Sequence, residues 1–218
     1  MNLTRKVAAE FLGTAALVTA TVSAGIMATK FQASPALALV YVGISTGGVL
    51  ALLILTLGGI SGAHFNPAVS LVMVVRKALS AREFGFYVLA QFTGAFVGVA
   101  VANATNALPV IQVSEINRSD NALLLGEVVA TVGLVGLILA LIKLHKESAI
   151  PVSVATWVAA AIMFTSSTCF ANPAVTFGRI FTSSGSGIAP TSALFFALVQ
   201  FLSALLAVQL VDKLFDKE

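Results

Sequence analysis

Two short stretches of the chain hold an asparagine followed by a proline inside apolar sequence: SGAHFNPAVS at 61–70 and CFANPAVTFG at 169–178. An asparagine side chain can cap the first turn of a helix, and proline is tolerated there because its missing N–H would have no intrahelical partner. The carboxamide can also donate hydrogen bonds to a passing molecule. We therefore predict two capped helix starts that face a polar site. Their residues are Asn66, Pro67, Ala68, Asn172, Pro173 and Ala174.

Each predicted helix is too short to cross a membrane. Asn66 to Lys77, and Asn172 to about residue 183, are each roughly 12 residues or about 17 Å of helix, which is half of a ~30 Å hydrocarbon core. Non-helical backbone at that depth survives only where it is buried in protein or lines a watery cavity. We therefore expect two re-entrant half-helices that meet at the centre of a pore. The positive ends of their dipoles would disfavour cations there.

The surrounding elements must be membrane-spanning helices. Of the 218 residues, 58% are apolar and only 10% are charged, which excludes an ordinary soluble domain. Apolar runs of about 20 residues, long enough to span a bilayer, recur along the chain. We predict an all-α membrane protein, a bundle of six transmembrane helices plus the two half-helices. The predicted spans are 7–28, 36–57, 84–105, 122–142, 150–168 and 190–211.

Positive charges lie in the short connections between these spans. With both termini cytoplasmic, nine Lys or Arg residues fall inside and three outside, as the positive-inside rule requires. We expect a multi-pass protein of a plasma membrane, with a bacterial inner membrane favoured, and no nucleic-acid partner. The nine are Arg5, Lys6, Arg76, Lys77, Arg82, Lys143, Lys146, Lys213 and Lys217, and the three are Lys30, Arg118 and Arg179.

The two halves of the chain repeat one pattern. AEFLGTAALV and GEVVATVGLV share Glu-x-x-x-Thr, and QFTGAFVG and QFLSALLA share Gln-Phe-x-small-Ala. Each half holds three spans, an odd number, so the second copy would enter the membrane inverted and a shared site would lie at the midplane. We predict one channel domain over 1–218, with inverted repeats at about 1–106 and 121–218 joined by an extracellular linker.

Glu10 and Glu127 are acids deep in the predicted spans, at matched positions of the two repeats. An acid at membrane depth is functional by default, and a proton relay is one interpretation. The matched placement favours a structural role, in which each carboxylate accepts hydrogen bonds from the backbone N–H groups of a re-entrant loop. His64, two residues before Asn66, would brace its loop and line the pore, or alternatively titrate and gate it.

With these motifs in this order, the chain resembles the major intrinsic proteins, the family of aquaporins and aquaglyceroporins, over its full length. The resemblance implies a homotetramer in the lipid bilayer, with one pore per subunit that conducts water and small neutral solutes. Counted from the two asparagines as in the family, the selectivity filter falls on Thr46, Ala160, Cys169 and Val175, and is small and weakly polar. Most of the family has an arginine where this chain has Val175.

The missing arginine implies a wide outer mouth. The pattern is similar to that of bacterial channels associated with arsenite export, so glycerol and metalloid hydroxides such as arsenite become expected solutes. Arg179 lies one helical turn after Val175, and helical side chains lean toward the N-terminus, so its guanidinium could reach back into the filter. The alternative is an arginine that snorkels to the membrane interface.

Other function classes have less support. A water-selective aquaporin is the first alternative. A secondary transporter also fits inverted repeats with broken helices, but ion coupling needs intramembrane charges beyond the two glutamates. A single cysteine, and no nucleophile triad, phosphate loop or spaced His/Cys cluster in the sequence, give no basis for an enzyme, a metal site or a cofactor.

Overall fold

The computed structural model describes residues 2–215, which form eight α-helices and two 3-10 helices. Six of them are long and apolar enough to cross a membrane, counting η1 with α6. Together with two short helices that start at the Asn-Pro-Ala motifs, they confirm the predicted fold class. The elements are α1 (Leu3–Lys30), α2 (Pro35–Ser61), α3 (Pro67–Val75), α4 (Ala81–Thr105), α5 (Asn121–Lys143), η1 (Glu147–Ala149), α6 (Ile150–Phe164), α7 (Pro173–Gly178), η2 (Arg179–Phe181) and α8 (Pro190–Phe215).

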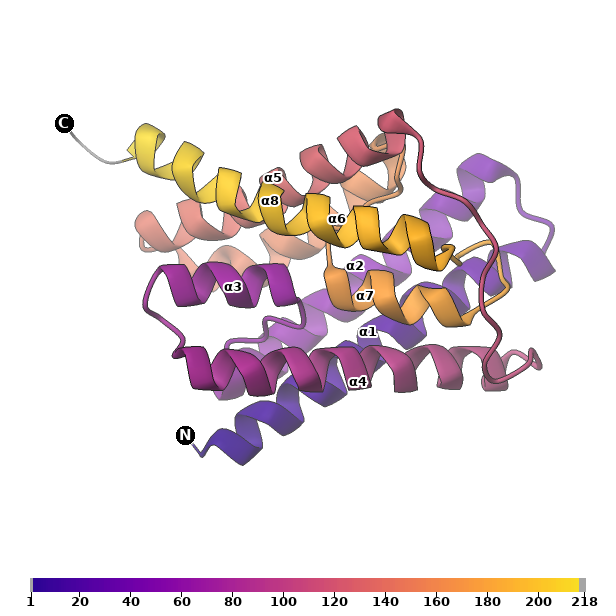
Figure 1. The fold of residues 1–218 in the computed structure, drawn as a ribbon, viewed down its shortest axis with the longest axis horizontal. Helices are drawn as coiled ribbons and strands as arrows, with labels where there is room; N and C mark the ends of the chain where they lie inside the picture. Colours follow the sequence, from indigo (N-terminus) through magenta and orange to yellow (C-terminus); the bar gives the residue numbers. More distant parts are fainter. Residues whose placement is uncertain (1, 216–218) are drawn as a thin grey trace.

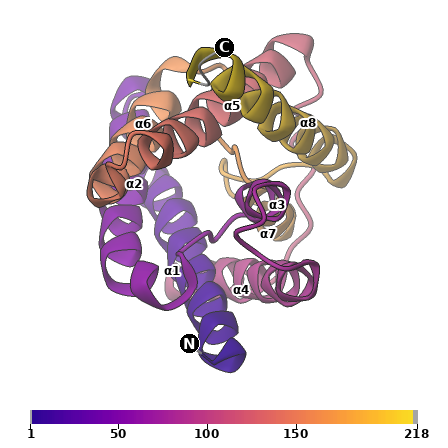
Figure 2. The same ribbon diagram turned by 90° about the vertical axis from the view of Figure 1, so that its left-hand side faces the viewer.

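The long helices surround the two short ones. α1 begins and α8 ends at the same end of the molecule, hereafter the terminal side, and the segment 106–120 crosses the opposite end, hereafter the linker side (Figure 1). Seen end on, α3 and α7 lie one behind the other within the ring of long helices (Figure 2). α3 therefore runs from the centre to the terminal side, and α7 from the centre to the linker side. Lys217, one of the charges assigned to the cytoplasmic side, lies outside the described residues.

Two predicted helices are shorter in the structure. The span predicted at 150–168 ends at Phe164, because Thr165 takes up extended backbone (φ −90°, ψ 142°) and the chain turns back toward the centre. The half-helix predicted to reach about residue 183 is α-helical only to Gly178 and continues as η2. It ends at Thr182, which is extended (φ −133°) and whose hydroxyl donates to the side-chain oxygen of Asn103 on α4 at 2.8 Å.

Glycines bring α4 into backbone contact with α1. A Cβ atom at Gly94 would lie 2.5 Å from the carbonyl oxygen of Phe11, and one at Gly98 would lie 2.4 Å from that of Ala15. Small residues at this spacing let two helices approach closely in a bilayer. The Thr19 hydroxyl adds a 3.0 Å hydrogen bond to the Gly98 carbonyl oxygen. This crossing fixes the position of the helix that carries Glu10.

Candidate functional site

Both Asn-Pro-Ala motifs start helices as predicted. Asn66 has extended backbone (φ −152°, ψ 116°), and its Oδ1 accepts a 2.9 Å hydrogen bond from the N–H of Ala68. Asn172 has nearly the same backbone (φ −155°, ψ 112°), and its Oδ1 accepts from the N–H groups of Ala174 at 2.9 Å and Val175 at 3.3 Å. The predicted N-caps are therefore confirmed.

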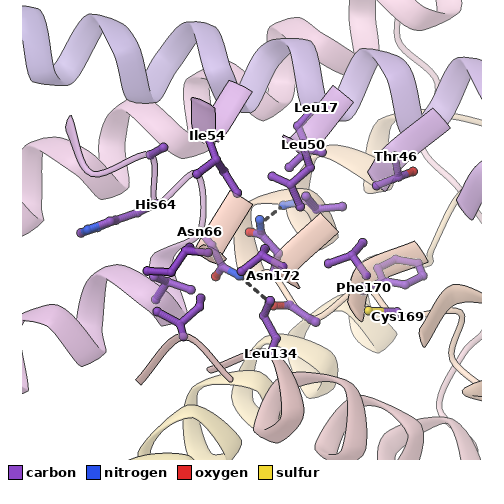
Figure 3. Close-up of a pocket in the computed structure, with 18 of the residues that line it drawn as sticks. Leu17, Thr46, Leu50, Ile54, His64, Asn66, Leu134, Cys169, Phe170 and Asn172 are labelled. Carbon is purple, nitrogen blue, oxygen red and sulfur yellow. Dashed lines mark hydrogen bonds between the residues drawn. The ribbon is translucent and has the colours of Figure 1, made fainter. Parts of the chain in front are cut away.

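Each asparagine also reaches the opposite half of the molecule. Nδ2 of Asn66 donates to the carbonyl oxygen of Ala171 at 2.8 Å, and Nδ2 of Asn172 donates to that of Phe65 at 2.7 Å (Figure 3). A carboxamide has two N–H groups, so each side chain keeps a second donor. Because both asparagines line the central cavity, these donors are held at a fixed place beside it.

The loops that precede the two asparagines repeat the same unusual backbone. Ala63 (φ 51°) and Phe65 (φ 48°) in the first loop match Cys169 (φ 50°) and Ala171 (φ 45°) in the second. Residues with a side chain rarely adopt this left-handed region, and such strain persists only where the surrounding structure imposes it. Each loop must therefore be fixed from outside.

A buried glutamate holds each loop. Glu10 accepts hydrogen bonds from the N–H groups of the two residues before Asn66, at 3.0 and 2.7 Å. Glu127 accepts from the N–H groups of the two residues before Asn172, at 2.9 and 2.8 Å. Both glutamates are fully buried, at 0% exposure. The geometry is that of a structural acceptor, because backbone N–H groups without such a partner would be costly at this depth.

A glutamine completes each of these networks. Nε2 of Gln91 on α4 donates to Glu10 at 2.8 Å and to the Ser70 hydroxyl at 3.0 Å. Nε2 of Gln200 on α8 donates likewise to the glutamate of its own half and, at 2.9 Å, to the Thr176 hydroxyl. From the sequence alone, the two glutamines are identified only as matched positions of the repeat. Ser70 and Thr176, each four positions after its asparagine, are the sequence signal that indicates these Glu–Gln–hydroxyl networks.

A cavity of about 270 Å³ passes both asparagines, from η1 on the terminal side to η2 on the linker side. On one side it meets the re-entrant loops, where no other described residue donates a hydrogen bond to the carbonyl oxygens of residues 62–64 or 168–170. The rest of the lining is mostly hydrocarbon, with the hydroxyl groups of Thr21 and Thr46 as polar exceptions. A molecule inside therefore meets donors and acceptors on one face and apolar side chains on the other. The apolar wall includes Leu17, Leu50, Ile54, Leu134 and Val158.

His64 lines this cavity on the terminal side of Asn66. Its Nδ1 lies 3.0 Å from the Ser70 hydroxyl, and its ring packs edge-on against Tyr87 with centroids 5.4 Å apart. Contacts from α3 and α4 therefore hold the imidazole in place. Within residues 2–215, no three His, Cys, Asp or Glu side chains come together as metal ligands.

Three of the four predicted filter positions, Thr46, Cys169 and Val175, line the cavity toward the linker side. The Thr46 hydroxyl lies 3.1 Å from that of Thr21, a further lining residue that is not predicted from the sequence. Threonines on two different helices thus place a pair of hydroxyl groups at the wall.

Ala160, the fourth predicted position, does not line the cavity. α6 instead presents residues spaced by four, among them Val158 and Ile162. A residue two positions after Val158 points about 200° away around the helix, so Ala160 faces elsewhere. Counting back from Asn172 fails because the count passes through the non-helical segment 165–172, which does not fix the rotation of α6.

Beyond the predicted filter positions, an aromatic and a charged side chain also line the linker-side mouth. Arg179 is buried, at 5% exposure, and lines the cavity together with Phe170. The guanidinium therefore does not snorkel to the interface. An aromatic ring and a cation both contribute to this mouth, although neither occupies a filter position counted from the family pattern.

Comparisons with known proteins agree with this architecture. Residues 1–169 match the family described as Major intrinsic protein. Aquaglyceroporin AqpS of Rhizobium meliloti (strain 1021) is 46% identical over 210 residues, which cover 96% of this chain and 90% of that protein. Aquaporin Z of Brucella melitensis biotype 1 is 39% identical over 98 residues, 44% of this chain and 42% of that protein. The structure of the aquaglyceroporin from Plasmodium falciparum shares the fold, with a TM-score of 0.77 over 97% of this chain and 96% of that one at 21% identity.

Proposed function

The chain belongs to the major intrinsic protein family of membrane channels, and we propose that it conducts water, glycerol and other small uncharged solutes passively, while excluding ions and protons. Membership in a channel family confirms the expectation that it is not an enzyme. The observation that carries the proposal is the two-sided cavity. Hydroxyl groups of a polyol match the loop carbonyls and the spare asparagine N–H groups, and its carbon chain matches the hydrocarbon wall.

Exclusion of protons follows from the donors at the centre. Asn66 and Asn172 each cap a half-helix, so the positive ends of two helix dipoles and two amide donors face the same point. A water that accepts from both amides is turned with its oxygen toward them, which interrupts a continuous proton-relaying file. Neutral solutes experience no comparable barrier.

We propose further that the solutes include metalloid hydroxides such as arsenite. Val175 beside Asn172 leaves room where most of the family has an arginine, and a relative of 46% identity over nearly the whole chain is an aquaglyceroporin. Arsenite is a neutral, glycerol-sized molecule with three hydroxyl groups at neutral pH. The asparagine donors, the loop carbonyl acceptors and the passage width that suit glycerol therefore suit arsenite as well.

We also propose how the chain sits in its membrane. The protein is multi-pass, with six spans. The positive-charge excess supports a cytoplasmic terminal side and an extracellular segment 106–120 in a bacterial inner membrane. Matching loops, caps and glutamates in the two halves support one channel domain built from inverted repeats at about 1–106 and 121–218. A homotetramer is the assembly that family membership favours.

Light scattering from proteoliposomes tests this function. Vesicles holding the purified chain are shrunk with sucrose to measure water flux, and with glycerol, urea or arsenite to measure re-swelling as each solute enters. We expect faster shrinkage than in protein-free vesicles, and faster re-swelling with glycerol and arsenite. Water flux without glycerol or arsenite flux would support the water-selective alternative, and no flux at all would contradict the channel.

A further inference from the structure

The guanidinium of Arg179 is fixed at the linker-side mouth by two contacts. Its Cζ lies 3.5 Å from the ring centroid of Phe170, which places the planar group against the aromatic face. Its Nε donates to the carbonyl oxygen of Ser186 in the loop before α8. Stacking on the ring and the Nε bond together restrict the orientation of the planar group.

The two terminal nitrogens of Arg179 have no protein acceptor among the described residues. They are also not among the side-chain atoms of residues 2–215 that are fully buried without a partner. Since Arg179 lines the cavity, we infer that their four N–H groups are presented to the lumen. A solute at the mouth therefore meets a rigid, planar, charged donor.

A second arginine holds the same loop and the same ring. Arg118, from the linker between the two halves, donates through Nε to the carbonyl oxygen of Gly187 at 2.9 Å and through Nη2 to that of Gly185 at 3.0 Å. These two carbonyls flank the Ser186 carbonyl that accepts from Arg179. The Cζ of Arg118 also lies 5.3 Å from the Phe170 ring centroid. Two guanidinium groups are thus bound to three successive carbonyls and to one ring.

We propose that Arg179 is the specificity-determining cation of the outer mouth, which repels cations and orients hydroxylated solutes, and that Arg118 is its positioning residue. The proposal rests on the channel function above and adds two residues to it. Arg179 is four residues beyond Val175, about 6 Å along a helix, so charge selection and pore width are separated in this chain. The mouth can exclude cations without narrowing the passage at Val175.

Electrostatics in the mouth favour this role. Glu127 is the acid that interacts electrostatically with both Arg118 and Arg179, and its carboxylate already accepts hydrogen bonds from its loop and from Gln200. We take a permeating monovalent cation roughly 6 Å from the Arg179 guanidinium and an effective dielectric constant of about 20. Coulomb's law then gives about a 100-fold reduction in cation passage for this one unit of positive charge. Removing Arg179 should therefore have a large effect on cations and a small one on neutral solutes.

The test compares potassium leak and glycerol flux in the same proteoliposomes of the full chain. Arg179→Leu should raise potassium leak by up to about 100-fold relative to wild type, by the same Coulomb estimate, because the helix dipoles at the centre stay in place. Water flux should be retained. Arg179→Lys should keep potassium excluded because the charge stays, but change the glycerol-to-urea flux ratio because an ammonium cannot stack or donate as a planar fork. Arg118→Leu should give a smaller rise in leak.

Arg82→Leu is the matched control, because it removes the same charge from an exposed position at the start of α4 and should leave the leak unchanged. If Arg179→Leu fails to insert, Arg179→Gln is measured in its place. A conducting Arg179→Leu or Arg179→Gln variant with wild-type potassium leak would overturn the inference. A wild-type protein that conducts no glycerol would instead count against the proposed function, so the two failures are distinguishable.

Discussion

Replacing Glu127 with glutamine tests whether this buried acid fixes the second re-entrant loop. Oε1 accepts from the Phe170 N–H at 2.9 Å, and Oε2 accepts from the Ala171 N–H at 2.8 Å and from Gln200. An amide keeps one oxygen, so one of the two backbone N–H groups would face an NH2 group. An unsatisfied buried donor costs about 1–3 kcal/mol, and weakening the remaining charge-assisted bonds adds about 1–2 kcal/mol. We expect a loss of about 2–5 kcal/mol in all.

For a chain of this size, that loss corresponds to a Tm lower by about 10 °C, because each kcal/mol shifts the Tm by about 2–4 °C. Thermal denaturation of the detergent-purified protein measures it, with glycerol flux in proteoliposomes as the second readout. Both should fall in Glu127→Gln. Glu115→Gln, which makes the same change at an exposed linker position, should alter neither. A Glu127→Gln variant with wild-type Tm and flux would refute the structural role, and one that lost only a dependence on proton gradient would indicate a relay.

Three further changes have defined outcomes. Val175→Arg should lower glycerol flux in the vesicle assay and spare water flux, because a long cationic side chain enters the filter beside Asn172; unchanged glycerol flux would contradict the position of this residue. A mercurial should block flux through wild type but not through Cys169→Ser, because that thiol lines the cavity, and equal block in both would place the reactive site elsewhere. Gly94→Ala should cost about 1–3 kcal/mol and lower the Tm, since its Cβ would lie 2.5 Å from a carbonyl oxygen, whereas Gly85→Ala on the same helix, with nothing within 4 Å, should not.

The fold could be predicted from the sequence because its determinants are local. An Asn-Pro pair indicates where a helix starts, and the length of an apolar run indicates whether the helix can span a bilayer. The position of Glu10 and Glu127 in matching spans likewise indicated which backbone groups they would serve. In each case the residue type and the sequence next to it are enough to predict the structural role.

The filter was predicted less well because it depends on distant contacts. Ala160 was assigned by counting through a loop, but the rotation of α6 is fixed by its packing against α2 and α5. The position of the Arg179 guanidinium depends on Phe170, on the loop before α8 and on Arg118 in the linker. Nothing in the sequence indicates that these three parts of the chain are neighbours. Side chains that meet through tertiary packing carry no signal in local spacing.

The most direct test of the central claim, a fixed passage beside Asn66 and Asn172, is the exchange of radiolabelled glycerol across proteoliposomes with and without unlabelled glycerol on the opposite side. A fixed passage predicts a flux that rises linearly with the gradient, shows no acceleration by glycerol on the far side, and ignores an imposed proton gradient. Overshoot of the label during counterflow, or uptake driven by protons, would show that the binding site alternates between the two faces and would contradict the account.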